Sequence, residues 1–188
     1  MIKSVCVYSA SSDAVAPKQW FEMPRELSEF TIRPATNADC GRVRALVFGV
    51  LREYGLTPEP HATDADLSDL EAHYLKTGGA FWVVVDAAGA IVGSAGLQPE
   101  SGGDCELRKM YLAPAVRGRG LGRRLLELAV ARAGELGFRR VTLGTASVLQ
   151  PAIRLYERAG FEPIPCDHFP GRCDAAYALE LGVRPRTS

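Results

Sequence analysis

The sequence predicts one α/β (α+β) domain, built from a sheet of about six to seven strands and about four helices. Three observations support this. The chain has 188 residues, 47% of them apolar and 23% charged, which is enough for one domain with a sizeable core. Short apolar runs bounded by Gly and Pro are typical of strands. Apolar residues at three- and four-residue steps over 121–136 predict a long amphipathic helix.

The chain is expected to open the domain with a strand and a helix. The run FTIRPAT, 30–36, alternates in polarity and contains Pro34, as a short strand does near its end. A helix is expected over 37–55, with Thr36 or Asn37 as its N-cap and Gly55 as its stop.

A second helix and two strands follow. The helix is expected over 64–79, where two glycines end it. The strands are expected at 80–86 and 90–99, joined by a tight turn around Ala88 and Gly89.

The second half alternates strands with helices. A strand at 105–114 precedes the amphipathic helix, which Gly137 caps, and a strand at 139–146 precedes a helix with proline in its first turn. Two strands close the domain, and the second of them is expected at 175–181. The expected elements of this half are 105–114, 122–137, 139–146, 151–160 and 175–181.

Composition excludes several classes of protein. Lys plus Arg equals Asp plus Glu, and this zero net charge argues against a dedicated nucleic-acid binder. Five scattered cysteines without a CxxC pair predict neither a disulfide framework nor a metal site. The sequence shows no membrane-length apolar run and no leader pattern at its start. We therefore expect a cytoplasmic protein without membrane or nucleic-acid partners, and leave a homodimer open.

The stretch VRGRGLGRR, 116–124, lies between a predicted strand and the long helix. Glycines at 118, 120 and 122 leave the backbone N–H groups at the helix N-terminus unblocked, which favours an anion site. The spacing fits neither the GxGxxG nor the GxxxxGK[ST] phosphate loop. A glycine-rich turn beside a solvated basic helix face is the alternative.

The neighbours of this loop resemble a known family. RGRGLG matches the RxxGxG/A motif of the GCN5-related N-acetyltransferase (GNAT) superfamily, and LYERAGF matches its LYxxxGF motif. The resemblance covers about 31–181 and implies the GNAT fold, a mixed central sheet with splayed middle strands, in a domain at 31–182. It implies acetyl-CoA as cosubstrate and no metal. By resemblance, Met110, Tyr111 and Leu112 pair with the pantetheine arm, and the loop amides of Arg117, Gly118, Arg119, Gly120, Leu121 and Gly122 hold the pyrophosphate.

The same resemblance suggests two catalytic groups. Glu106 matches the glutamate base of the histone-acetylating branch, and Tyr156 matches the tyrosine that protonates the leaving thiolate. Each has an alternative role: Glu106 in an ion pair with Arg108 or Lys109, and Tyr156 as a core aromatic. Cys105 is expected to be a buried free cysteine rather than a nucleophile.

The implied reaction is direct transfer of acetyl from acetyl-CoA to a primary amine of a small molecule or protein, in a ternary complex. A non-catalytic acetyl-CoA sensor is the alternative. The acidic segment 57–73 suggests attraction for a cationic amine, whereas Arg172 and Asp174 suggest a zwitterion. Leu149 replaces an asparagine that many relatives use as a cofactor contact, which Ser147 or Gln150 is then expected to supply.

The two ends of the chain fall outside this pattern. Residues 1–30 form an N-terminal extension that resembles the opening of the LOG phosphoribohydrolase family, without that family's PGGxGTxxE motif. This extension is expected to be docked or mobile, and residues 183–188 to be a disordered tail.

Overall fold

A computed structural model describes residues 29–166 and 171–182. Nearly all of the predicted extension 1–30, the loop residue His168 and the tail 183–188 lie outside the described residues.

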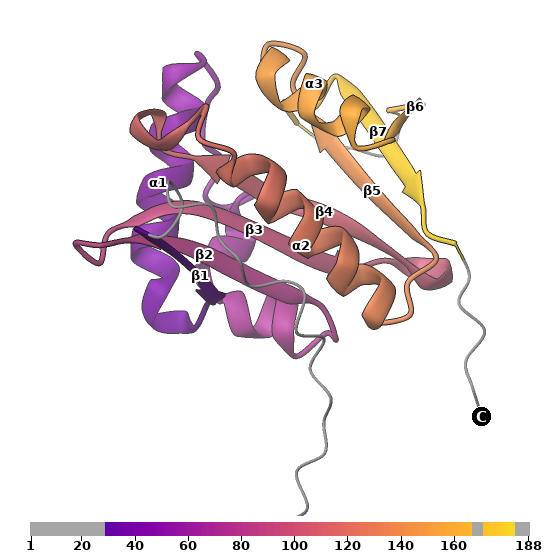
Figure 1. The fold of residues 1–188 in the computed structure, drawn as a ribbon, viewed down its shortest axis with the longest axis horizontal. Helices are drawn as coiled ribbons and strands as arrows, with labels where there is room; N and C mark the ends of the chain where they lie inside the picture. The colour runs from indigo at the N-terminus through magenta and orange to yellow at the C-terminus, as the bar shows by residue number, and fades with distance from the viewer. Residues whose placement is uncertain (1–28, 167–170, 183–188) are drawn as a thin grey trace, which may run out of the picture.

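One seven-stranded sheet, in the order β1-β2-β3-β4-β5-β7-β6, organises the described chain (Figure 1). Neighbouring strands are antiparallel except β4 and β5, which are parallel, so the sheet is mixed as expected. The six strands predicted with bounds are present with ends shifted by at most two residues, and β6 is the closing strand that was expected without bounds. Their bounds are β1 Phe30–Pro34, β2 Ala80–Asp86, β3 Ile91–Pro99, β4 Asp104–Leu112, β5 Arg140–Thr145, β6 Glu162–Ile164 and β7 Ala175–Glu180.

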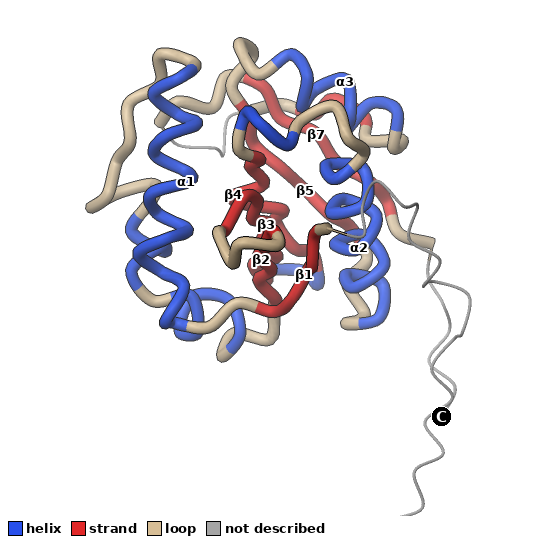
Figure 2. The backbone as a smooth tube through the Cα atoms, turned by 60° about the vertical axis from the view of Figure 1, so that its left-hand side comes forward, coloured by secondary structure: helices blue, strands red, loops and turns tan. Residues whose placement is uncertain are grey.

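The main helices cover both faces of this sheet. Helix α1, Cys40–Glu53, packs on one face, and α2, Leu121–Glu135, packs on the other, with α3, Gln150–Arg158, beyond it beside β5 and β7 (Figure 2). Each face has its own apolar core: Val43, Val47 and Leu51 under α1, and Leu121, Leu125 and Tyr156 under α2 and α3. Since both faces are covered, β2 has a run of four consecutive buried residues.

The helix expected over 64–79 is replaced by two short pieces, a 3₁₀ turn at Ala65–Ser68 and a π-helix at Glu71–Leu75. Asp69 separates them. Its backbone is outside the helical region (φ −149°, ψ 87°), and its carboxylate accepts hydrogen bonds from the Ala72 N–H (2.8 Å) and the Asn37 side chain (2.8 Å). A side chain that caps the backbone in this way competes with a continuous helix.

Asp39 anchors the start of α1 to β1. Its carboxylate accepts hydrogen bonds from Arg33 (2.7 and 2.8 Å), Arg42 (2.6 Å) and the Thr36 N–H (3.1 Å), and Asp39 is 1% exposed. Thr36 is the N-cap of the 3₁₀ turn Asn37–Asp39, whereas the N-cap of α1 itself is Asp39 and not Thr36 or Asn37 as predicted. The hydrogen bond from Arg33 lowers the pKa of Asp39 from 3.8 to about 2.

Asp39→Asn is expected to lower the free energy of unfolding at pH 7 by about 2 kcal/mol, because the depressed pKa stabilises the folded state above the unfolded value. This stabilisation is lost as the pH falls through 3.8 toward 2. Urea titrations of both proteins at pH 7 and pH 2.5 measure it. A difference that is absent at pH 7, or that does not narrow in acid, would contradict the assignment.

Candidate active site between β4 and β5

The functional cleft begins where β4 and β5 separate. The two strands pair only through Asp104, Cys105 and Glu106 opposite Arg140, Val141 and Thr142. Beyond Glu106 each strand runs on without the other, as Figure 1 shows. From 107 to 112, β4 stays paired with β3, but its other edge is no longer paired with β5. Apart from the Leu112 carbonyl, which accepts from Arg117 Nε (3.0 Å), this edge is available to another extended molecule.

A bulge at Lys109 accompanies the separation. Lys109 has φ +52°, and the register between β3 and β4 shifts at Ser94–Gly96. The Ser94 hydroxyl donates to the Lys109 carbonyl (2.7 Å), and the Lys109 ammonium donates to Thr63 O and Asp64 Oδ1 (2.7 Å each). These contacts hold a strained residue in place, and a bulge bends its strand.

A cavity of about 480 Å³ occupies this gap. Its walls come from β4, the start of α2, the end of β5 and α3, with the end of α1 alongside. The lining residues that bear on binding and chemistry are Glu106, Arg108, Met110, Tyr111, Leu112, Gly118, Gly120, Tyr156 and Arg172.

The glycine-rich loop adopts the backbone that its sequence requires. Gly118 has φ +75° and Gly120 has φ +83°, and Gly120 is the N-cap of α2. No described atom lies within 4 Å of an ideal Cβ at either position, so the space beside both glycines is open. The positive end of the α2 dipole faces this space.

The predicted cofactor-binding residues divide between cavity and core. Seven of the nine line the cavity, whereas Leu121 is 1% exposed in the core and the Arg119 side chain is directed to Glu29 and the Phe30 ring. The Arg117 guanidinium turns to α1, with two hydrogen bonds to Glu53 (2.6 and 2.7 Å). Binding through the backbone amides of these residues stays a prediction.

Glu106 occupies the last paired position of β4 before the gap. Its side chain is 17% exposed and accepts a hydrogen bond from Arg108 Nη1 (3.1 Å). Burial raises the pKa of this carboxyl, and the positive charge of Arg108 opposes the rise. The contact with Arg108 is one of the two predicted roles. The role as base stays a prediction, and a cavity-lining carboxyl with a raised pKa is suited to it.

Tyr156 reaches the cavity from the α3 side. It is 6% exposed, and its ring lies 5.9 Å from that of Phe161. Burial raises the pKa of the phenol well above its usual value, so the hydroxyl keeps its proton. Tyr156 is thus a buried aromatic on the cavity wall, and its role as proton donor stays a prediction.

The Acetyltransferase (GNAT) family matches residues 47–161, which include both strands of the gap, the loop and α3. The chain belongs to this family. The uncharacterised N-acetyltransferase YjgM of Escherichia coli is 41% identical over 138 residues, which are 71% of this chain and 82% of that protein. N-acetylaspartate synthetase of Danio rerio is 38% identical over 55% of this chain, but the match spans only 37% of the synthetase.

Solved structures of this family share the fold. A GNAT acetyltransferase of Staphylococcus aureus Mu50 superposes with a TM-score of 0.74 at 22% identity, covering 80% of this chain and 98% of that one. The yncA protein of Salmonella typhimurium, solved with its cofactor acetyl-CoA, superposes with a TM-score of 0.64 at 26% identity, covering 86% of this chain and 99% of that one. The protein is accordingly an acetyl-CoA-dependent N-acetyltransferase, and the predicted fold, reaction type and cosubstrate are confirmed.

The cavity of this GNAT domain fits acetyl-CoA. Arg123, Arg154 and Arg158 line it next to the open glycine loop, which suits the phosphates of the cofactor. The unpaired edge of β4 at 110–112 suits the amide-bearing pantetheine arm.

Gly120→Ala is expected to raise the Kd for acetyl-CoA about 10-fold, because an alanine at φ +83° costs about 1–2 kcal/mol and relaxation of the loop turns its amides away from the phosphates. Gly89→Ala is the matched control, since Gly89 has φ +81° and open space in the β2–β3 turn. Calorimetry should show weaker binding for the first variant alone, although both lose stability. Unchanged affinity in Gly120→Ala would contradict the loop assignment.

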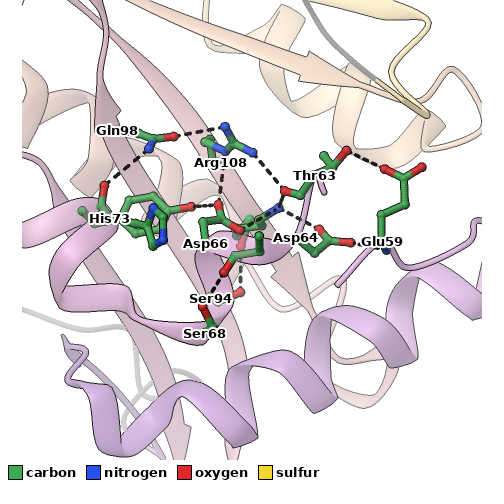
Figure 3. A network of polar contacts seen from close by, with 12 residues as sticks. Glu59, Thr63, Asp64, Asp66, Ser68, His73, Ser94, Gln98 and Arg108 are labelled. Atoms are coloured by element: carbon green, nitrogen blue, oxygen red, sulfur yellow. Dashed lines mark hydrogen bonds and ion pairs between the residues drawn. The ribbon is translucent and has the colours of Figure 1, made fainter. Parts of the chain in front are cut away.

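The acidic segment does not present its charge to the cavity as expected. Asp64 and Asp66 are 1% and 6% exposed, and their carboxylates face Lys109, Arg108 and Arg172. Figure 3 shows the contact between Asp66 and Arg108. The expectation of a surface that attracts cationic amines is therefore wrong for these carboxylates. The sequence of the acidic segment does not reveal this pairing, because the basic partners of Asp64 and Asp66 lie more than 40 residues away along the chain.

The expected zwitterion pair is also separated. Asp174 caps the Ser147 N–H (2.5 Å) and hydroxyl (2.7 Å), while Arg172 lines the cavity. Leu149 lines the cavity. The Ser147 hydroxyl donates to Asp174, and the Gln150 amide donates to the Ser147 carbonyl, so neither side chain is seen in the expected cofactor contact.

Cys105 is fully buried, and burial raises the pKa of its thiol to about 12, so a thiolate nucleophile is disfavoured as predicted. Within residues 29–166 and 171–182 there is no group of three His, Cys, Asp or Glu side chains placed to hold a metal. None of the helices in the described part of the chain is long and apolar enough to cross a membrane. The cytoplasmic location and a homodimer stay predictions.

Proposed function

We propose that this N-acetyltransferase acts on the primary amine of a small molecule by direct transfer, with Glu106 as the base and Tyr156 as the acid. The observation that carries the proposal is that both groups line one cavity, Glu106 from β4 and Tyr156 from α3. The similarity to N-acetylaspartate synthetases, at 36–38% identity, supports a small-molecule acceptor.

Each group has one proton to move. Glu106 takes a proton from the ammonium of the acceptor through a water molecule, and the free amine attacks the thioester carbonyl carbon. A backbone N–H of residues 110–112 donates to the oxyanion as the C–N bond forms. The C–S bond then breaks, and the thiolate takes the proton of the Tyr156 hydroxyl. The amine loses its second proton to solvent. Glu106 releases its proton to solvent and Tyr156 takes one from solvent, which returns both groups to their starting states.

The test is thiol release from acetyl-CoA with a panel of amino acids, polyamines, arylamines, aminoglycosides and lysine peptides, with mass spectrometry of the products. An acetylated small amine is the expected result. If acetyl-CoA binds in calorimetry while every amine stays at the no-acceptor rate, the protein is an acetyl-CoA sensor instead. If lysine peptides exceed all small amines, the acceptor is a protein.

A further inference from the structure

Two guanidinium groups, Arg108 and Arg172, line the acceptor end of the cavity next to Glu106. The carboxylates behind them, Asp64 and Asp66, are almost completely buried. The charged side chains that line this end are three cations, Arg108, Lys109 and Arg172, and one carboxyl group, Glu106. The Lys109 ammonium binds Asp64 (2.7 Å), and Glu59 lies 3.8 Å from Arg172. Such a pocket suits an anionic group better than a second cation.

Arg172 is held in place but not saturated. Its Nη1 and Nη2 donate to the two oxygens of Asp64 (3.1 and 2.7 Å), and its side chain is 12% exposed. A guanidinium has five N–H donors. With two given to Asp64, and even with the Tyr111 hydroxyl as a further acceptor, donors remain for a ligand. A planar donor fork fixed in this way matches a carboxylate.

The position of Arg108 indicates how far the anionic group of a ligand lies from its reacting amine. Its Nη1 lies 3.1 Å from Glu106 Oε2, and its Nη2 donates to the Thr63 carbonyl (3.1 Å). An amine that shares a water molecule with Glu106 is therefore only a few bonds away from the Arg108 guanidinium. This spacing excludes a long linker between the amine and the anionic group.

We infer that the acceptor is an α-amino acid, whose carboxylate binds Arg172 and Arg108 while its amine faces Glu106. The inference rests on the proposed function and adds the substrate class. A purely structural role for the two arginines, which brace residues 63–66 against β4, predicts no discrimination among amines by their carboxylate.

The test compares each amino acid with its own amide, which keeps the side chain and the amine but lacks the carboxylate charge. The wild-type kcat/KM is expected to favour the acid at least about 10-fold, the effect of a charge-assisted hydrogen bond. Loss of the carboxylate charge lowers the pKa of the amine and raises its reactive fraction, so this bias acts against the expected result. A long ω-amino acid, whose carboxylate is far from its amine, should have a kcat/KM close to that of the amides.

Arg172→Met is expected to bring the acid-to-amide ratio close to one. Because this variant leaves Asp64 short of a partner, Asp64→Asn/Arg172→Met provides a second, charge-balanced variant with the same expected ratio. Arg132→Met is the control, since Arg132 lies on α2 and pairs with Glu135 (2.9 Å). It should keep the wild-type ratio.

The outcomes separate the two proposals. The carboxylate site would be overturned by an acid-to-amide ratio at or below one in the wild type, or by a high ratio that persists in both Arg172 variants. In either case, acetylation of the amides would still support the proposed function. Failure of every amine, acids and amides alike, would overturn the proposed function and the inference with it.

Discussion

Tyr156→Phe is expected to lower kcat by about 10²- to 10⁴-fold, because the thiolate then leaves without a positioned proton donor. The side chain is buried beside Phe161, so removal of one oxygen keeps the packing of the ring. The Kd for acetyl-CoA and the melting temperature should stay close to the wild-type values. Stopped-flow thiol release measures kcat, titration calorimetry measures the Kd, and scanning calorimetry measures the melting temperature.

Tyr177→Phe is the matched control for this variant. Tyr177 is 8% exposed in the same core, but it lies on β7 and interacts with Glu157 rather than with the cavity. Its kcat should be close to that of the wild type. A Tyr156→Phe variant that retains more than about a tenth of the wild-type kcat would leave Tyr156 with its core role alone.

Glu106→Gln is expected to lower kcat/KM by about 10²-fold or more, because the acceptor ammonium then loses its base. The wild-type kcat/KM should rise with pH through the pKa of Glu106, which burial places above 4.5, and again through the pKa of the amine. In the profile of the Glu106→Gln variant, only the rise of kcat/KM through the pKa of the amine should remain. Profiles of kcat/KM from pH 5 to 9 test this.

The stability of Glu106→Gln separates a base from a structural ion pair. A carboxyl with a raised pKa in the folded state stabilises the fold fully below its unfolded value of 4.5, and this stability is lost as the pH rises through the folded pKa. Gln, which does not ionise, should therefore unfold at an equal or higher temperature than the wild type at pH 8. A clear drop there would indicate that the ion pair with Arg108 is the main role.

The sequence predicts most of the fold because its local patterns agree with each other. Gly55 and Gly137 are both in the left-handed region after the helices they were expected to end. The glycines of the 116–124 loop behave in the same way, since a positive φ at Gly118 and Gly120 is a local requirement that the residue type reveals.

Long-range pairing is what the sequence leaves hidden. The segment 64–79 looks helical by its spacing, but Asp66 is drawn to Arg108 and Lys109, and Asp69 caps the following turn. The bulge at Lys109 has no local marker, because lysine rarely has a positive φ. Arg172 is placed in the cavity by Asp64, 108 residues away.

The initial-rate pattern tests the central claim, direct transfer in one cleft, most directly. Thiol release is measured against acetyl-CoA concentration at several fixed concentrations of the best α-amino acid. Intersecting double-reciprocal lines are expected, because acetyl-CoA and the amine must occupy the cavity together. Parallel lines would indicate an acetylated enzyme intermediate and would contradict the roles of Glu106 as base and Tyr156 as acid in a direct transfer.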